Sequence, residues 1–337
     1  MIASMNAYLD RLTLVIVTWK GDELVRDCLD SIVKVYGRLP PTVLVDNAAL
    51  ASTRALAAEY AGVTYLPQPD NLGFAGGNCA AWPLCDREYV VHLNNDTRLT
   101  DDSFSPLVDF MDAHPACAAA QGKIVLAANG KLDGCGGFFS PLGVLAFRGQ
   151  YADEAPEFDE PMRVAVVGGA FFIVRREAVN AAGGIFHAHF KSYYEEIDLC
   201  CRLGLAGYEC WYVPTPAVLH LHSVTASKFG WEKILPQYYR NIGFSLRTCF
   251  GRYGRLRIGL PLKVLSFAQC VVALLKGNAG PLKAHRAAAR ALRGDADLIC
   301  ATRGKLRANR TVSDRKFLSF AIRSQPWRYY LALARRG

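Results

Sequence analysis

Short apolar runs alternate with stretches of helical periodicity along the first hundred residues of the chain. The first run, LTLVIV at residues 12–17, is continuous and rich in branched side chains, which is typical of a strand buried on both faces. Further strands are predicted at residues 42–45, 63–66 and 89–93, and helices after Gly21, at 53–60 and at 78–84. Strands that alternate with helices predict βαβ units and a mostly parallel sheet.

Polar residues directly follow three of these predicted strands. Thr18, Asp46 and Asp96 each stand at the carboxyl end of a strand. Parallel strands bring their carboxyl ends to one edge of a sheet, and ligands of such folds bind in the crevice outside that edge. We therefore expect these three side chains to line one crevice.

The pattern is weaker in the middle of the chain. Glycine and proline at 134–143 indicate hairpins and loops, and short strands are predicted at 164–167 and 170–174. Residues 195–205 have helical periodicity and an acidic first turn, which suits the positive end of the helix dipole. This region therefore predicts a less regular continuation of the sheet.

The charge of the chain is divided unevenly. Residues 226–337 hold 23 Lys and Arg against 4 Asp and Glu, whereas the preceding residues hold 16 basic and 26 acidic side chains. This asymmetry predicts two parts with different partners, an α/β part at 1–225 and a basic helical part at 226–337. Cationic, aromatic and apolar residues mixed on helices fit an anionic membrane surface, and nucleic acid is the alternative partner for such charge.

Three helices are predicted in the basic part, at residues 233–250, 258–275 and 282–292. The middle helix is mostly apolar, but Pro261 and Lys263 interrupt it. A helix that lies in the membrane plane or is buried is therefore favoured over one that spans the bilayer. The sequence shows no helix-turn-helix spacing, zinc site or RNA-binding motif, so we expect no nucleic-acid partner.

The cysteines and the first residues bear on the cellular compartment. Eleven cysteines lie at spacings that suit neither a zinc site nor a CxxC pair, which is typical of reduced thiols in the cytoplasm. Residues 1–10 lack the basic and long apolar regions of an export signal. We expect a cytoplasmic protein held peripherally at the inner face of a membrane.

Two motifs near the strand ends could bind a nucleotide. HLNNDT at 92–97 places a carboxylate beside two amides, which suits Mg²⁺ or Mn²⁺ on a diphosphate but also an ordinary turn. NLGFAGGN at 71–78 has three glycines that could let the backbone approach a ligand closely. A glycine-rich loop of this kind is equally compatible with a purely structural role.

Two later motifs could take part in catalysis. YYEEID at 193–198 holds three carboxylates, one of which could act as a general base, although an acidic helix start explains them as well. LHLHS at 219–223 would place His220 and His222 on the same face of a strand, either as metal or pyrophosphate contacts or as ordinary polar side chains.

Taken together and in order, these motifs resemble those of the family 2 inverting glycosyltransferases, most closely the bacterial rhamnosyltransferase-like branch. The resemblance covers roughly residues 11–245. It rests on VTWK (17–20), VDNAA (45–49), NLGFAGGN (71–78), LNNDT (93–97), GGAFFIVRRE (168–177), GGIF (183–186), YYEEIDLCCRL (193–203), AGY (206–208), VPTPAVLHLHS (213–223) and YYRN (238–241).

The resemblance implies a GT-A fold, a Rossmann-like mixed sheet flanked by helices, followed here by the basic helical extension. The catalytic domain would span 1–225, with the nucleotide-sugar-binding part at about 11–122 and the acceptor-binding part at about 123–225. The activity would be transfer of a sugar, rhamnose or another hexose, from a nucleoside-diphosphate sugar to a hydroxyl of a glycan or lipid-linked acceptor, in bacterial cell-surface polysaccharide synthesis.

The resemblance also implies a role for individual residues. Glu196 would be the catalytic base, and Glu195 and Asp198 would shape the acceptor pocket. Asp96 and His220 would hold a divalent metal, Mn²⁺ or Mg²⁺, on the diphosphate. The nucleotide sugar would contact a larger set, in which Asp46 meets the nucleobase: Thr18, Asp46, Asn71, Gly73, Asn78 and Asn95.

The sequence departs from the family pattern at four places. Ala48-Ala49-Leu50 replaces the small polar turn that usually follows VDN. Glu196 stands where the family usually has Asp, Lys20 replaces the usual Asn, and the Asp-Glu pair expected after GGF is missing from GGIFHAH. A nucleotidyltransferase that activates a sugar phosphate is an alternative of the same layered fold. It would need a glycine-rich basic loop after the first strand, where VTWKGDEL has only one glycine and one lysine.

Overall fold

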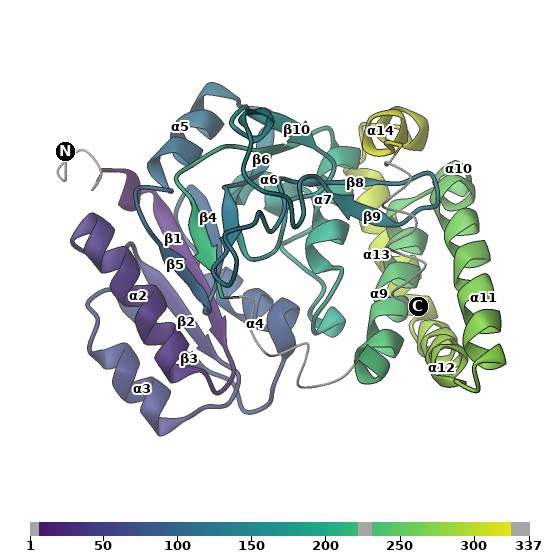
Figure 1. Cartoon of the computed structure of the whole chain (residues 1–337), viewed down its shortest axis with the longest axis horizontal. Helices are drawn as coiled ribbons and strands as arrows, with labels where there is room; N and C mark the ends of the chain where they lie inside the picture. Colours follow the sequence, from purple (N-terminus) through teal and green to yellow (C-terminus); the bar gives the residue numbers. More distant parts are fainter. Residues whose placement is uncertain (1–6, 222–230, 325–337) are drawn as a thin grey trace.

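An eight-stranded mixed sheet forms the centre of the molecule in the computed structural model, which describes residues 7–221 and 231–324 (Figure 1). The strand order is β10-β12-β6-β11-β4-β1-β2-β3. The strands are β1 (Leu12–Thr18), β2 (Thr42–Asp46), β3 (Val63–Pro67), β4 (Tyr89–Asn94), β6 (Cys117–Gln121), β10 (Met162–Val164), β11 (Phe171–Arg175) and β12 (Glu209–Tyr212).

The four strands predicted in the first hundred residues are confirmed, and they form a parallel half-sheet. β1 pairs in parallel with both β2 and β4, and β2 pairs in parallel with β3. Leu14 and Ile16 of β1 pack into the core on one face of the sheet, whereas Val15 packs into the core on the other face. Burial on both faces explains why this segment reads as a continuous apolar run.

The other half of the sheet corrects the expectation of a mostly parallel arrangement. β11 runs antiparallel to both β4 and β6, β10 runs antiparallel to β12, and β12 is parallel to β6. The strand expected at 164–167 is displaced to 162–164, and β6 and β12 were not predicted. The β6 sequence, CAAAQ, has little β propensity, and its complete burial between neighbouring strands holds it in the sheet.

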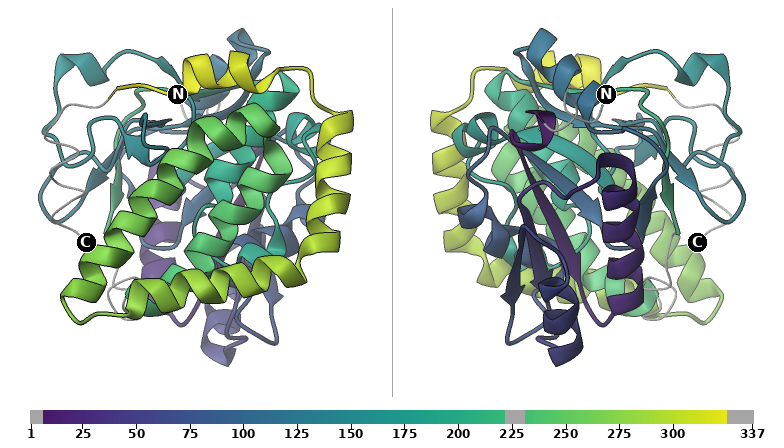
Figure 2. Two further views of the ribbon diagram at one scale, coloured as in Figure 1. Left: turned by 90° about the vertical axis from the view of Figure 1, so that its right-hand side faces the viewer. Right: turned by 90° about the vertical axis from the view of Figure 1, so that its left-hand side faces the viewer.

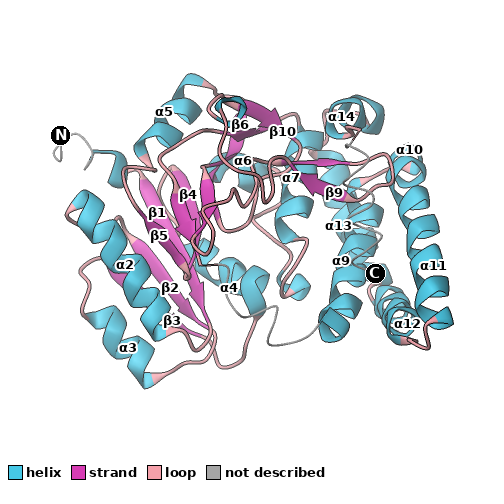
Figure 3. Ribbon diagram, in the orientation of Figure 1, coloured by secondary structure: helices cyan, strands magenta, loops and turns pink. Residues whose placement is uncertain are grey.

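Helices cover both faces of the sheet (Figure 3). One core contains side chains of α2 (Asp22–Tyr36), α3 (Ala51–Ala58) and α5 (Ser105–Ala113), of which α5 was not predicted. The opposite core contains side chains of α4 (Gly73–Ala81), α6 (Arg176–Ala181) and α7 (Glu195–Ala206). The predicted Rossmann-like mixed sheet flanked by helices is thus confirmed.

Two smaller sheets of short strands accompany the eight-stranded sheet. β5 (Thr97–Leu99), β13 (Val218–His220) and β7 (Ile124–Leu126) form a small sheet, and β8 (Gly137–Phe139) and β9 (Leu145–Phe147) form a hairpin. Strands of three residues are too short to show a period in the sequence. The small sheet matters for the site, because its pairing sets His220 opposite Thr97, next to Asp96.

The basic region forms the helical layer seen in Figure 2. Phe244, Ile258 and Leu318 of this layer belong to the same core as Leu199 of α7. The expected boundary at residue 225 therefore does not separate two cores. The helices are α9 (Trp231–Cys249), α10 (Arg252–Gly254), a π-helical turn at Arg255–Gly259, α11 (Leu260–Leu275), α12 (Gly280–Gly294), α13 (Ala296–Ala308) and α14 (Asp314–Ala321).

Candidate functional site

Polar side chains at the ends of β1, β2 and β4 meet at one edge of the sheet, as expected. Thr18 pairs with Asp46 in the β1–β2 register. The Asn95 amide donates to Thr18 Oγ1 across 3.0 Å. A Cβ at Gly21 would lie 2.9 Å from the Asn95 amide nitrogen, so a side chain there would displace this pair. The edge therefore joins three positions that are far apart in the sequence.

Asp46 is fully buried in the turn that follows β2. Its carboxylate accepts hydrogen bonds from the backbone amides of Ala48 and Leu50 and from the Tyr65 hydroxyl, at 2.9, 2.7 and 2.9 Å. These bonds fix the turn between β2 and α3. The predicted contact of Asp46 with a nucleobase stays a prediction.

The glycine-rich motif at 71–78 is helical for most of its length, because α4 begins at Gly73. A Cβ at Gly73 would lie 2.3 Å from the Lys191 carbonyl oxygen, and one at Gly77 would lie 2.7 Å from Val17. The glycines thus allow α4 to approach a neighbouring loop and β1. The interpretation of these glycines as a loop that approaches a ligand is corrected, because protein atoms fill that space.

Asn78 is 1% exposed, and both ends of its amide are engaged within the chain. Its nitrogen donates to the Phe74 carbonyl, and its oxygen lies 2.6 Å from His92 Nδ1. This geometry ties the Asn78 side chain to neighbouring groups of the protein, and its predicted contact with the donor stays a prediction. Asn71 is exposed, and its side chain accepts from the Gly73 amide.

Near the end of β4, the His220 imidazole lies between the carboxylates of Asp96 and Asp133. His220 Nδ1 lies 2.7 Å from an Asp133 oxygen, and His220 Nε2 lies 3.4 Å from an Asp96 oxygen. Burial alone would lower the pKa of His220, but the two carboxylates outweigh that effect and raise it to about 9. Asp133 holds the imidazole so that Nε2 faces Asp96, an orientation often found for metal-binding histidines.

The sequence placed Asp96 and His220 together but missed Asp133. That residue lies in a glycine-rich loop 87 positions before His220, and no local spacing connects the two. Among the described residues, no group of three or more His, Cys, Asp or Glu side chains has the arrangement of a metal site. His222, the other predicted candidate, lies outside the described residues.

Glu195 and Glu196 occupy the first turn of α7. Glu195 is buried, and its Oε2 has no hydrogen-bond partner among the described residues. Burial raises the pKa of Glu195 well above its ordinary value, and the neighbouring Glu196 raises it further. Burial also raises the pKa of Glu196, to about 7. Glu196 is half-buried, so it keeps a path to solvent or substrate.

Glu196 lies at the same sheet edge as Asp96. A Cβ at Gly169 would lie 3.5 Å from Glu196 Oε1, so the carboxylate sits directly over this glycine. The next residue, Ala170, accepts a hydrogen bond from the amide of Asn94 at the end of β4. Because β11 starts where β4 ends, Glu196 lies near the end of the strand that Asp96 follows.

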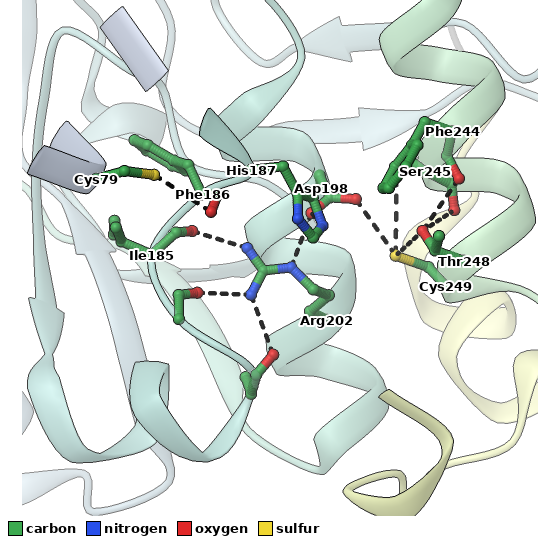
Figure 4. A network of polar contacts seen from close by, with 12 residues as sticks. Cys79, Ile185, Phe186, His187, Asp198, Arg202, Phe244, Ser245, Thr248 and Cys249 are labelled. Atoms are coloured by element: carbon green, nitrogen blue, oxygen red, sulfur yellow. Dashed lines mark hydrogen bonds and ion pairs between the residues drawn. The ribbon is translucent and has the colours of Figure 1, made fainter. Parts of the chain in front are cut away.

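Asp198 is paired within the protein, and its predicted place in the acceptor pocket stays a prediction. It is 1% exposed and pairs with Arg202 Nε at 2.7 Å, with His187 at 3.3 Å, while the Cys249 thiol donates to its other oxygen (Figure 4). Burial alone would raise the pKa of Asp198, but His187 and Arg202 hold it well below its usual range.

Arg202 also binds the loop before α7. Its guanidinium donates to three successive parts of the loop, the carbonyls of Ala182, Gly184 and Ile185 (Figure 4). Asp198 and Arg202 therefore act together as a buried support for the GGIF segment. A buried charge pair of this kind is expected to be structural, because each member satisfies the other.

The loop that leads into Glu195 has an unusual backbone. Lys191, Tyr193 and Tyr194 all have positive φ angles, of 54°, 74° and 78°. Such angles cost non-glycine residues of the order of 1 kcal/mol each. Neighbouring elements must therefore hold this loop in place.

Two helices hold the loop from opposite sides. The α4 amides of Phe74 and Ala75 donate to Ser192 Oγ and to the Lys191 carbonyl. From α9, Asn241 is fully buried and its amide donates to a set of loop carbonyls, those of Phe190, Ser192 and Tyr193. The motifs at 71–78 and 238–241 thus share one task, which is to fix the loop that carries the two glutamates.

Comparison with known families decides what this arrangement belongs to. A family model described as "Glycosyltransferase like family 2" matches residues 10–242. The chain belongs to this family. It is therefore a glycosyltransferase, and the match runs beyond residue 225 to include the α9 segment with Asn241.

The glycosyltransferase has curated relatives in Mycobacterium tuberculosis. The N-acetylglucosaminyl-diphospho-decaprenol L-rhamnosyltransferase of strain CDC 1551 / Oshkosh is 28% identical over 237 residues, which are 63% of this chain and 76% of the relative. The same protein of strain ATCC 25618 / H37Rv matches with the same values. This likeness agrees with the rhamnosyltransferase-like branch that the motifs indicate.

The solved structure of GalNAc-T7 confirms the predicted GT-A fold. GalNAc-T7, solved with UDP, GalNAc and Mn²⁺, superposes with a TM-score of 0.54 at 15% identity, and covers 69% of this chain. The glycosyltransferase spans about half of that protein, 47% of its length. The mannosyltransferase PcManGT from Pyrobaculum calidifontis, in complex with GDP-Man and Mn²⁺, has a TM-score of 0.49 at 16% identity and covers 95% of this chain and 90% of its own.

The close approach of α4 to the loop predicts a large effect of Gly73→Ala. Gly37 is a matched control, because its φ of 77° resembles the 71° of Gly73 but nothing lies within 4 Å of its Cβ position. Gly37→Ala should lower the unfolding free energy by about 1 kcal/mol. Gly73→Ala should cost about 1–3 kcal/mol more because of the clash. Denaturant unfolding of both variants measures the difference, and equal losses would contradict the packing role.

Asn241→Ala should destabilise the glycosyltransferase and loosen its catalytic loop. Removal of the buried amide leaves carbonyls without a donor, at a cost of about 1–3 kcal/mol. The control is Asn309→Ala, which removes a single hydrogen bond from an exposed asparagine and should cost under about 1 kcal/mol. Denaturant unfolding gives both values, and backbone hydrogen exchange should rise at residues 190–194 in the Asn241 variant alone. Unchanged exchange there would contradict the clamp.

Proposed function

We propose that this glycosyltransferase inverts the anomeric configuration as it moves a sugar from a nucleoside-diphosphate donor to an acceptor hydroxyl. The observation that carries the proposal is the position of Glu196. Its half-buried carboxylate lies over Gly169, at the sheet edge that also holds Asp96 and His220. A base and an anion-binding region at one edge are what a direct displacement needs.

Glu196 is the proposed catalytic base. It accepts the proton of the acceptor hydroxyl while that oxygen forms a bond to the anomeric carbon. The bond from this carbon to the diphosphate oxygen breaks, and the nucleoside diphosphate leaves. A carboxylate with a pKa of about 7 suits this task, because a large fraction is ionised near neutral pH and it binds a proton much more strongly than an ordinary glutamate.

Glu195 is proposed to hold the acceptor rather than to take its proton. Its pKa is raised well above the ordinary value by burial and by the charge of Glu196, so it stays protonated when Glu196 is ionised. A protonated carboxyl can donate one hydrogen bond and accept another. Its unpartnered oxygen is therefore suited to a sugar hydroxyl of the acceptor.

Asp96 and His220 fit a divalent cation, Mn²⁺ or Mg²⁺. Their facing atoms are 3.4 Å apart, so both could reach one ion at ligand distances of about 2 Å, and binding would displace the proton that the two carboxylates favour on His220. Two protein ligands leave room for diphosphate oxygens and water, as is usual for such ions. When bound, the metal would stabilise the negative charge that develops on the leaving diphosphate.

The strand-end crevice is proposed to bind the nucleotide. Asp46 and its turn would face the nucleobase, and the Thr18–Asn95 pair would line the nucleoside and first phosphate. Asn71 is exposed just before the start of α4, so its side chain can face the donor.

The acceptor is proposed to be lipid-linked. The Mycobacterium relatives are by name transferases of L-rhamnose to a diphospho-decaprenol acceptor, and the family match and shared motifs extend this class to the present chain. The proposed donor sugar is rhamnose or another hexose, and the product a precursor of a bacterial cell-surface polysaccharide. An acceptor of this kind would hold the enzyme at the cytoplasmic face of the inner membrane.

Glu196→Gln should abolish transfer and leave the fold intact. The loss of a general base is expected to lower kcat by about 10²–10⁴-fold, because the amide cannot accept the proton. The exposed Glu177→Gln on α6 is the control and should keep full activity. Release of nucleoside diphosphate from a panel of nucleotide sugars gives the rate, and near-normal turnover of Glu196→Gln would exclude it as the base.

The pH dependence of kcat/KM in the wild-type enzyme should report the ionisation of Glu196. The base works when deprotonated, so kcat/KM should fall as pH drops through the raised pKa of about 7. An acid limb near pH 4.3, the range of an ordinary glutamate, would contradict the burial argument. Initial rates at fixed ionic strength between about pH 3.5 and pH 9 cover both possible positions of this acid limb and provide the profile.

Asp96→Ala should remove the metal-dependent stabilisation by nucleotide. In the wild type, a nucleoside diphosphate with Mn²⁺ should raise the melting temperature, and EDTA should cancel the effect. In Asp96→Ala the rise should vanish while the melting temperature without ligand stays close to that of the wild type. Asp133→Asn should weaken Mn²⁺ binding by about 10–100-fold, since it orients His220. Asp297→Ala, on an exposed turn of α13, should behave as the wild type.

A further inference from the structure

An exposed apolar stripe runs along α11. Five of its side chains are spaced three or four residues apart, so they lie on one face of the helix. All five are exposed, and Val264 and Phe267 are 62% and 72% exposed. The five residues are Leu260, Val264, Phe267, Val271 and Leu274, and they are called the α11 stripe below.

The opposite side of this helix packs on the protein. Ile258, Cys270 and Ala273 are buried, and α11 lies beside α12 on the outer side of the helical layer (Figure 2). Within the described residues, Arg252–Leu275 is long and apolar enough to cross a membrane by length and composition, although only 22% of its most apolar window is buried. The core helix of a soluble protein would bury most of such a window, so this segment is not a core helix.

The geometry favours a helix in the plane of a membrane over one that spans it. A spanning helix meets lipid around its whole circumference and needs about 20 apolar residues. Here one side is fixed to the protein, α11 has 16 residues, and three arginines precede it within Arg252–Arg257. The exposed side of α11, with the stripe and the neighbouring Val272 and Leu275, is therefore the side available to lipid.

The charges around the stripe are all of one sign. Residues 233–294 hold 12 Lys and Arg and no Asp or Glu. Arg252, Arg257, Lys263 and Lys276 are exposed close to the stripe along the helix, and none of them forms an ion pair among the described residues. An apolar face with a cationic border needs a partner that is both apolar and anionic.

We propose that the α11 stripe inserts into the headgroup region of an anionic lipid bilayer, with the bordering cations on the lipid phosphates. A second copy of the chain fits less well, because a two-fold contact would set this cationic border against itself. The inference extends the membrane location proposed above by assigning its surface. It requires nothing of the catalytic residues, so it can be tested apart from the transfer reaction.

Vesicle flotation of the full-length enzyme tests this surface. The wild type should float with vesicles of phosphatidylcholine and phosphatidylglycerol, bind less at high salt, and bind poorly to phosphatidylcholine alone. Phe267→Glu should weaken binding by about tenfold or more, because it removes a large apolar group and adds a negative charge. Lys263→Gln should weaken it by about fivefold.

A matched variant separates this surface from general effects of charge. Leu298 is an apolar residue of α13, 44% exposed and outside the stripe, so Leu298→Glu makes the same change elsewhere and should bind vesicles like the wild type. Phe267→Trp should keep binding, with a blue-shifted emission and quenching by brominated lipid. Phe267→Glu should retain release of nucleoside diphosphate from the donor, since it lies outside the proposed site.

The outcomes discriminate clearly. Equal losses in Phe267→Glu and Leu298→Glu, or binding without any preference for anionic lipid, would overturn the proposal. A concentration-dependent dimer that Phe267→Glu dissociates, with no vesicle binding by the wild type, would assign the stripe to a second copy instead. Glu196→Gln should still float with vesicles, so a failed transfer assay and a failed membrane assay are distinguishable.

Discussion

The catalytic region depends on the clamp that α4 and α9 place on the loop at 190–194. Three residues of this loop adopt left-handed backbone angles, which an unsupported chain would leave. Backbone amides of α4 hold it from one side and the buried Asn241 from the other. The loop thereby fixes where α7 begins, and with it the positions of Glu195 and Glu196 in the first turn of that helix.

Burial gives the two glutamates their chemistry. Both pKa values are raised because the ionised forms lose water, and only Glu196 keeps partial exposure. For the neighbouring Asp198 the pKa is lowered instead of raised, because Arg202 and His187 favour the ionised carboxylate. Glu195, Glu196 and Asp198 follow one another closely along α7, but they lie on different sides of the helix and therefore differ in pKa.

The basic helical layer has two faces with different tasks. Its inner face completes the core behind α7 and supplies Gln237 and Asn241 to the loop, so the catalytic region is incomplete without it. Its outer face carries the α11 stripe and a cationic border. The helical layer therefore connects its exposed outer face to the loop that carries Glu195 and Glu196, through helices packed on a shared core.

The sequence by itself determined the parallel half-sheet, the convergence of Thr18, Asp46 and Asp96 on its edge, and the charge division of the chain. These follow from periodicity and from strand ends, which are local properties. Only the tertiary structure decided that Asp133 orients His220, that Asn78 and Asp198 are internal supports, and that the glycines at 71–78 make room for a loop. Each of those depends on residues tens of positions apart that meet through the antiparallel return of β11, the small sheet of β13, or the packing of α9. Side-chain pairing across such distances leaves no periodic trace in the chain, so packing alone reveals it.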